Sequence, residues 1–294
     1  MNSIIFVLIL IIIIIVLALL YVYYLIDYTS YIDFANISNI SYPPKRTAIL
    51  LSGQIRKGYM GCLWSQIINI IYPLNADVFF CFDNGTPAID KKNIVDLLKP
   101  KGHIWCDLDN VKDNGLIERN LEYMYSRIYK CNKLKEEYEY NNGFKYDIVI
   151  RSRPDLIIKE KIPLKIIKNI DKNTIYVPSV NKYDVLTSNR FIGTVDQFAL
   201  GDSDSMNIYA DVYNFIYPTY INLLKNKQVI CPTSESILNY YFKTKNLRLI
   251  FYYQSFILYD KRLNNNMLNA ISGFFKKHKY YPMMNCYLQN NDLL

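Results

Sequence analysis

The stretch that decides the fold is Tyr146–Leu156, YDIVIRSRPDL, near the middle of the chain. Its first part, Tyr146–Ile150, is mostly apolar and is typical of a buried strand. The apolar pattern then stops at the polar run Arg151–Asp155. Two arginines and a carboxylate are costly in an apolar setting unless they meet opposite charge. The stretch therefore predicts a strand over 146–150 that ends in a polar loop.

Short apolar runs alternate with segments of helical periodicity on both sides of this stretch. The alternation favours an α/β fold with a largely parallel sheet, and no linker divides the segments. Further strands are expected over 47–51, 76–82, 103–106 and 175–177 and within 194–201. Helices are expected around 63–71 and over 89–98, 117–140, 203–224 and 233–243.

Polar sequence follows two of the expected strands, as Ser52–Arg56 and as Arg151–Asp155. Ligands of parallel α/β sheets bind beyond the carboxyl ends of the strands. Arg151 and Arg153 are candidates to clamp a diphosphate through paired hydrogen bonds. Asp155 is a candidate to hold a divalent metal or a sugar hydroxyl. The alternative from the residues alone is an internal Arg–Asp pair that fixes the loop.

The stretch Tyr146–Leu156 resembles the hallmark of a family of glycosyltransferases found in bacterial surface-polysaccharide gene clusters and in large DNA viruses. The likeness continues in the same order over roughly residues 46–262. Five further segments are similar to segments of that family: AILLSGQIR (Ala48–Arg56), ADVFFCF (Ala76–Phe82), SRIYKCNKLKEEYE (Ser126–Glu139), VDQFALGDSDSMNIY (Val195–Tyr209) and the region of Glu235.

The resemblance implies a nucleotide-diphospho-sugar transferase of the GT-A type, with one α/β domain around a central, mostly parallel mixed sheet. In that fold a D-x-D motif after a central strand binds Mn²⁺ or Mg²⁺ together with the donor diphosphate. Here only Asp155 occupies the matching place, and Arg151 and Arg153 stand near the position of the first carboxylate. Two hypotheses follow: a metal held through Asp155, or a metal-independent site in which the arginines neutralise the diphosphate.

The resemblance also implies roles for residues outside the hallmark. Ser52, Gly53 and Arg56 would line the nucleotide, with Gly53 letting the backbone approach it. Asp196 would contact donor or acceptor hydroxyls. An inverting enzyme needs a general base, for which Asp196 and Glu235 are the candidates. The alternatives are that Asp196 caps a turn and that Glu235 is a carboxylate favoured at a helix N-terminus.

The N-terminus carries an uncharged apolar run from Ile4 to Ile26. At about 1.5 Å per residue this run can cross a hydrocarbon core of roughly 30 Å. We therefore predict a single-pass anchor over 1–26, a stem over 27–44 and a catalytic domain over 45–294. The nearest cations, Lys45 and Arg46, lie too far beyond the span to predict which side of the membrane the domain faces.

Composition narrows the choice of partners. The 294 residues hold 34 Lys and Arg against 26 Asp and Glu, which gives a formal net charge of +8. These charges are mixed along the chain, a pattern that argues against a nucleic-acid partner. The six cysteines form no C-x-x-C motif and are expected to be buried free thiols, with disulfides only in an oxidising lumen.

Together these features predict a membrane-anchored glycosyltransferase that moves a sugar from a nucleotide donor to a glycan, protein or lipid acceptor. The alternative is a membrane-anchored surface or virion protein that kept the fold without catalysis. The single carboxylate in the hallmark is the feature that favours this alternative.

Overall fold

The computed structural model describes six segments of the chain: residues 45–56, 59–107, 119–179, 196–226, 234–254 and 256–258. All of them belong to one compact unit, residues 40–263. The expected anchor over 4–26 and the stem over 27–44 lie outside the described residues. Within the described segments, no helix combines the length and the apolar character needed to cross a membrane.

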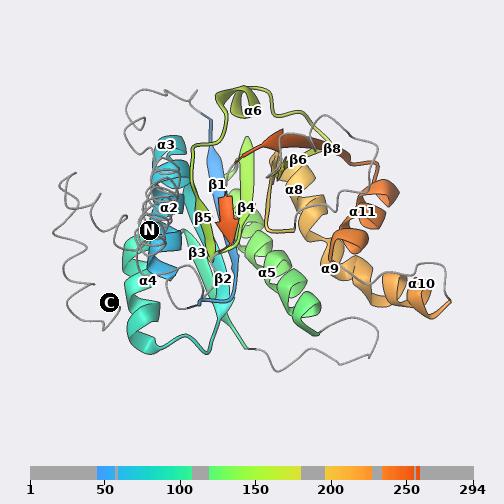
Figure 1. Ribbon diagram of the computed structural model, residues 1–294, viewed down its shortest axis with the longest axis horizontal. Coiled ribbons are helices and arrows are strands. Elements are labelled where there is room, and N and C mark those ends of the chain that lie inside the picture. The colour runs from blue at the N-terminus through green and yellow to red at the C-terminus, as the bar shows by residue number, and fades with distance from the viewer. Residues whose placement is uncertain are drawn as a thin grey trace, which may run out of the picture. The chain divides into compact units, whose positions relative to one another are not determined.

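A seven-stranded sheet forms the centre of this unit, in the order β3-β2-β1-β4-β7-β6-β8 (Figure 1). β7 runs antiparallel to both of its neighbours, and the other neighbouring strands pair in parallel. The predicted mixed, mostly parallel sheet is therefore confirmed. The strands are β1 Thr47–Gly53, β2 Asp77–Asp83, β3 Gly102–Cys106, β4 Ile148–Ser152, β6 Thr174–Ser179, β7 Phe198–Gly201 and β8 Arg248–Tyr253.

Helices cover both faces of the sheet, which explains why its central strands are apolar on both sides (Figure 1). One face packs against α2 Tyr59–Gln66, the π-helical turn η2 Ile67–Ile71, α3 Tyr72–Leu74 and α4 Ala88–Leu98. The other packs against α5 Arg119–Asn142, α8 Ser203–Ala210, α9 Val212–Phe215, η3 Ile216–Tyr220, α10 Ile221–Lys225 and α11 Ser234–Thr244. A short helix, α6 Leu164–Lys168, precedes β6.

A second, two-stranded sheet pairs β5 Leu156–Ile158 with β9 Phe256–Leu258 in antiparallel fashion. Polar side chains of α2 and η2 contact the backbone of β5. The Ser65 hydroxyl accepts a hydrogen bond from the Ile158 N–H at 3.0 Å, and the Asn69 amide donates to the Ile158 carbonyl at 2.7 Å. The sequence patterns did not predict β5, β8 or β9. β5 and β9 have only three residues each, too few to show a clear periodicity.

The long central helix was predicted well, whereas the helix expected over 203–224 is interrupted. α5 ends just before Gly143, whose φ of +67° suits glycine. The helix expected over 203–224 is divided at Asp211 into α8 and α9, and the chain then passes through η3, which contains Pro218. Proline has no backbone N–H to donate to the preceding turn, so a regular helix cannot run through it unchanged.

The predicted strand over 146–150 is shifted: β4 begins at Ile148 and continues through Arg151 and Ser152. The prediction that the strand stops at Arg151 was therefore wrong. Arg151 pairs in the ladder with Leu50 of β1 and Ala199 of β7. Its buried side chain lies on the α5 face of the sheet, where the guanidinium donates a hydrogen bond to the Asp196 carbonyl.

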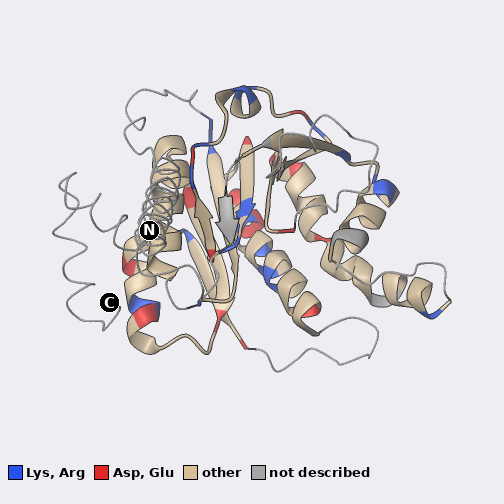
Figure 2. Cartoon of the chain, in the orientation of Figure 1, with Lys and Arg blue, Asp and Glu red and all other residues tan. Residues whose placement is uncertain are grey.

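Charged residues of both signs are interspersed over the described elements (Figure 2). Four cysteines lie within the described segments, and all four are buried free thiols, as expected: Cys62, Cys81, Cys106 and Cys131. The remaining two, Cys231 and Cys286, lie outside the described residues.

A buried ion pair joins α5 to α8. Lys135 is fully buried, and its Nζ lies 3.1 Å from Oε2 of Glu139 one turn later in the helix. The same ammonium donates to the Ser203 hydroxyl and to Oδ1 of Asn207 at 2.7 Å. Glu139 also accepts hydrogen bonds from the Ser203 hydroxyl at 2.7 Å and from the Tyr146 N–H at 2.8 Å. Both charges are therefore paired and hydrogen-bonded, as burial requires.

Removing the buried ammonium should be costly. We expect Lys135→Met to lower the free energy of unfolding by about 3–5 kcal/mol, because Glu139 then stays buried without its cation. The matched control is Lys133→Met on the same helix, where the Lys133–Glu136 pair is partly exposed, at 53 % and 28 %. It should cost less than about 1 kcal/mol. Urea unfolding of both variants measures the difference, and equal losses would contradict this account.

Candidate active site

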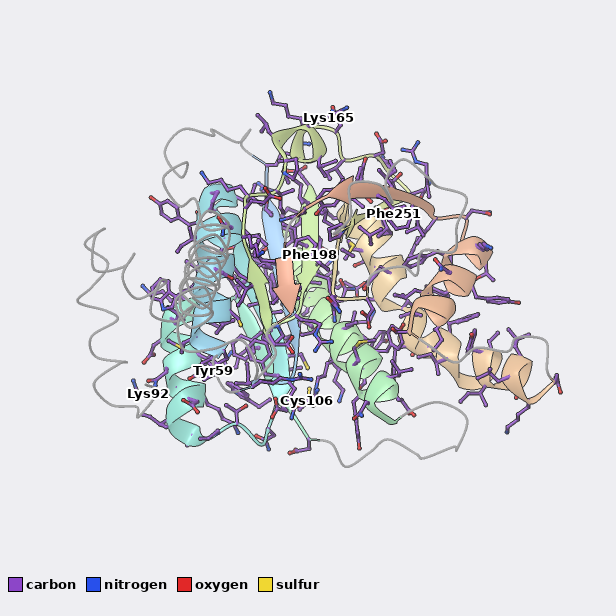
Figure 3. The ribbon with its side chains drawn as sticks, viewed as in Figure 1. Tyr59, Lys92, Cys106, Lys165, Phe198 and Phe251 are labelled. Carbon is purple, nitrogen blue, oxygen red and sulfur yellow. The ribbon has the colours of Figure 1, made fainter. Side chains whose placement is uncertain are left out.

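The polar segments singled out in the sequence meet where β1, β2, β3 and β4 end. This side of the sheet, formed by the C-terminal ends of these strands, is called its carboxyl edge here. β1, β2 and β4 run in parallel, and β7 begins at the same edge because it is antiparallel to β4. Figure 3 labels two residues of this region, Cys106 at the end of β3 and Tyr59 at the start of α2. The sheet topology therefore brings together three segments that are far apart in the sequence: 52–56, 151–155 and 196–197.

Asp155 is the centre of the charged groups at this edge. Its carboxylate is 3 % exposed and accepts two parallel hydrogen bonds from Arg153, from Nε to Oδ1 and from Nη2 to Oδ2, each 2.8 Å long. The Nε of Arg56 lies 3.4 Å from the same Oδ2. Burial lowers the pKa of Arg153, but the hydrogen bonds and charge of Asp155 outweigh it and the pKa is raised. One carboxylate thus binds two guanidinium groups.

The two loops that carry these arginines pack closely against each other. Gly53 has a φ of +151°, and a Cβ atom there would lie 2.9 Å from Cδ of Pro154. The loop after β1 is also held by Asp83 at the end of β2, whose Oδ1 accepts the Ile55 N–H at 2.8 Å. These contacts fix the backbone next to Arg56.

A buried glutamine of α2 holds the loop between β4 and β5, residues 153–155, which is called the hallmark loop below. The amide of Gln66 donates to the Arg153 carbonyl at 2.8 Å and to the Leu156 carbonyl at 3.2 Å. Gln66 is fully buried, and each of the two carbonyls accepts a hydrogen bond from its amide in place of one from water. The positions of Arg153 and Asp155 therefore depend on a helix that precedes β2 in the sequence.

Arg151 lies deeper than the other two arginines, on the α5 side of the sheet. It is 1 % exposed, and burial lowers its pKa. Its Nη1 donates to the Asp196 carbonyl, while the Arg153 N–H donates to the Gln197 carbonyl at 3.2 Å. Arg151 therefore ties the segment before β7 to the end of β4.

Several buried polar atoms near Arg151 have no hydrogen-bond partner among the described residues: Arg151 Nε and Nη2, Ser52 Oγ and Tyr209 Oη. Ser52 lies two residues beyond Leu50, the register partner of Arg151, and so on the same face of the sheet. Tyr209 comes from α8, and burial raises its pKa to about 12 although the charge of Arg151 opposes this. Unpaired buried donors are costly, so these atoms mark a place that a polar ligand or water would complete.

The two general-base candidates differ in how much the structure describes of them. Asp196 is 9 % exposed, at the carboxyl edge of the sheet, and its charge acts on both Arg151 and Arg153. Glu235 belongs to the first turn of α11, and its side chain lies outside what the structure describes. The roles of both residues stay predictions.

The implied Mn²⁺ or Mg²⁺ can be tested against the donor set at Asp155. A carboxylate offers about four lone-pair positions, and three N–H groups already approach this one. Within the described segments, no group of three or more His, Cys, Asp and Glu side chains could hold a metal ion. The described residues around Asp155 therefore do not fit a divalent cation.

Three residues of this region were missed in the sequence: Asp83, Gln66 and Tyr209. Asp83 is the last residue of β2 and so carries the same signal as the polar ends of β1 and β4. Gln66 and Tyr209 occupy helical faces, and no local pattern distinguishes a buried polar residue there from a solvent-exposed one.

No family model and no curated protein matches this chain. Among solved structures, it is similar to the glycosyltransferase GlyE of Streptococcus pneumoniae TIGR4, with 12 % identity and a TM-score of 0.39 over 70 % of this chain and 46 % of that one. The apo form of GlyE gives 13 % identity and a TM-score of 0.41, covering 83 % of this chain and 51 % of that one. The chain thus spans about half the length of GlyE.

The close approach of the two loops predicts the effect of adding one methyl group. We expect Gly53→Ala to lower the free energy of unfolding by about 1–3 kcal/mol, because the new Cβ would press on Pro154 in a strained backbone conformation. Gly85→Ala is the control, since its Cβ would make only an ordinary 3.6 Å contact with Asp83. Thermal unfolding of both variants checks this, and a stable Gly53→Ala protein would contradict the described packing.

Proposed function

We propose that this chain is a glycosyltransferase that uses a nucleotide-diphosphate sugar and transfers the sugar to a glycan, protein or lipid acceptor. The observation that carries the proposal is the meeting of 52–56, 151–155 and Asp196 at the carboxyl edge of the sheet. α/β sheets bind nucleotides at this edge, and the resemblance of Tyr146–Leu156 to a glycosyltransferase hallmark supports the same chemistry. In this proposal residues 4–26 anchor the protein in a membrane.

The proposed reaction divides the work among these residues. Ser52, Gly53 and Arg56 line the nucleotide, and the arginines of the hallmark hold the diphosphate. The acceptor hydroxyl attacks the anomeric carbon, and the bond from that carbon to the diphosphate oxygen breaks with its electron pair. In an inverting enzyme the acceptor proton passes to Asp196 or Glu235. The guanidinium groups stabilise the charge that develops on the leaving diphosphate.

Donor binding tests the proposal directly. Calorimetric titration of the full-length chain with UDP- and GDP-sugars, with and without Mn²⁺, should show binding of at least one donor. We expect Arg153→Ala to weaken that binding by about tenfold or more. The variant lacks a guanidinium group that can donate two charge-assisted hydrogen bonds to phosphate oxygens.

The matched control for this titration is Arg248→Ala. Arg248 is the first residue of β8 and forms a largely exposed ion pair with Asp171. It lies beside the start of β6, and so at the end of the sheet opposite the candidate site. The variant should bind the donor as the unmodified chain does. No binding of any donor in either condition would favour the alternative, a surface or virion protein that kept the fold without catalysis.

The general-base assignment has its own test. Asp196→Asn should lower kcat by about 10²–10⁴-fold with little change in donor affinity, because the amide cannot accept the acceptor proton. Asp171→Asn, an exposed carboxylate at the opposite edge, is the control. If Asp196→Asn keeps full turnover, the base is another residue, and Glu235→Gln becomes the next variant to measure.

A further inference from the structure

The ion cluster around Asp155 has the features of a diphosphate site that uses arginines in place of a metal. We infer that the guanidinium groups of Arg56 and Arg153, oriented by Asp155, hold the donor diphosphate, and that this binding requires no divalent cation. The inference rests on the proposed function, because it takes a nucleoside diphosphate as the ligand of this edge.

The bonding of Asp155 is the first argument. Arg153 engages both carboxylate oxygens at 2.8 Å, and Arg56 approaches Oδ2 at 3.4 Å. With the side chain only 3 % exposed, little of the carboxylate remains open to a cation and its hydration shell. Mg²⁺ in particular gives up its water reluctantly and needs near-octahedral geometry.

Electrostatics points the same way. A divalent cation at Asp155 would gain the attraction of one carboxylate but meet the repulsion of two guanidinium groups in contact with that carboxylate. Asp155 cancels one of these two positive charges, which leaves these three groups at +1, and the Asp196 carboxylate that also acts on Arg153 is shared with the buried guanidinium of Arg151. An anion is therefore favoured at this place over a cation.

The two arginines retain donors for such an anion. Arg153 uses Nε and Nη2 on Asp155, which leaves its Nη1 without a bond to any described residue, and the side chain is 21 % exposed. Arg56 contacts Asp155 only through Nε, and its side chain is 47 % exposed. Guanidinium groups recognise phosphate oxygens through paired N–H donors, which matches these free edges.

Asp155 is then a positioning residue rather than a metal ligand. Long arginine side chains lose conformational entropy when they bind a ligand, and a carboxylate that holds both in advance reduces this cost. The leaving diphosphate carries away the electron pair of the broken bond to the sugar. Two fixed guanidinium groups at its oxygens stabilise that charge without any rearrangement.

The direct test compares nucleotide binding with and without metal. UDP, GDP and inorganic pyrophosphate are titrated into the full-length chain by calorimetry, once in EDTA and once with Mn²⁺. We expect the Kd of the bound nucleotide to agree within about twofold between the two conditions. The nucleotide itself complexes Mn²⁺, so the reference is the electron paramagnetic resonance spectrum of the Mn²⁺–nucleotide mixture, which should not change further when the protein is added.

The outcomes separate this inference from the proposed function. Nucleotide binding that needs Mn²⁺, or Mn²⁺ immobilised by the complex, overturns the inference while the proposed function stands. Absence of nucleotide binding in both conditions overturns both. Binding in EDTA that Mn²⁺ leaves unchanged supports both.

Variants test the positioning role of Asp155. In EDTA, Asp155→Asn should weaken UDP binding by about tenfold and change its dependence on ionic strength, because both arginines lose their counter-ion. The control is Asp171→Asn, which removes an exposed carboxylate at the opposite edge of the sheet. If Asp155 were a metal ligand, Asp155→Asn would leave binding in EDTA unchanged and remove an effect of Mn²⁺.

A second variant covers the case in which Asp155→Asn does not fold. Arg56→Lys keeps the positive charge on a half-exposed side chain but loses the planar pair of donors. It should weaken UDP binding in EDTA by several-fold with unchanged thermal unfolding, and Arg56→Ala should weaken it further. Equal UDP affinity in Arg56→Lys, Arg56→Ala and the unmodified chain would overturn the assignment.

Discussion

The bidentate ion pair between Arg153 and Asp155 is the interaction on which the candidate site depends. It closes the turn between β4 and β5 and places a buried carboxylate where the loop after β1 can reach it with Arg56. A carboxylate this deeply buried would be unfavourable without such partners. Asp155 therefore needs cationic partners, and this need places the guanidinium groups of Arg153 and Arg56 at the carboxyl edge of the sheet.

The chain contains other buried cations, and their surroundings show how different the hallmark region is. Lys135 is surrounded by acceptors from α5 and α8, so its charge is satisfied within the protein. Arg151 has one hydrogen bond to a described residue and two nitrogens without a partner among the described residues. The first arrangement joins two helices, whereas the second leaves hydrogen-bonding capacity beside the edge where ligands of α/β sheets bind.

Much of the fold could be predicted because burial on both faces produces continuous apolar runs in the sequence. The strands at β1, β2, β3 and β6 and the helix α5 correspond to such patterns, and their alternation was enough to predict a mostly parallel sheet. The limits of β4 were predicted wrongly, since a charged residue inside a strand looks like the end of the strand. The hydrogen bond from Arg151 to the Asp196 carbonyl joins residues 45 positions apart, and the local sequence does not reveal it.

The sequence by itself determined which residues are candidates: the polar ends of β1 and β4, and Asp196 before β7. Only the tertiary structure decided how they are used, because each decisive partner comes from a distant segment. Arg56, in the loop after β1, contacts Asp155, in the loop after β4. Gln66 of α2 binds the backbone of that second loop, and Asp83 at the end of β2 binds the backbone of the first. Hydrogen bonds and ion pairs act over a few ångströms in space, whereas sequence patterns register only neighbours along the chain.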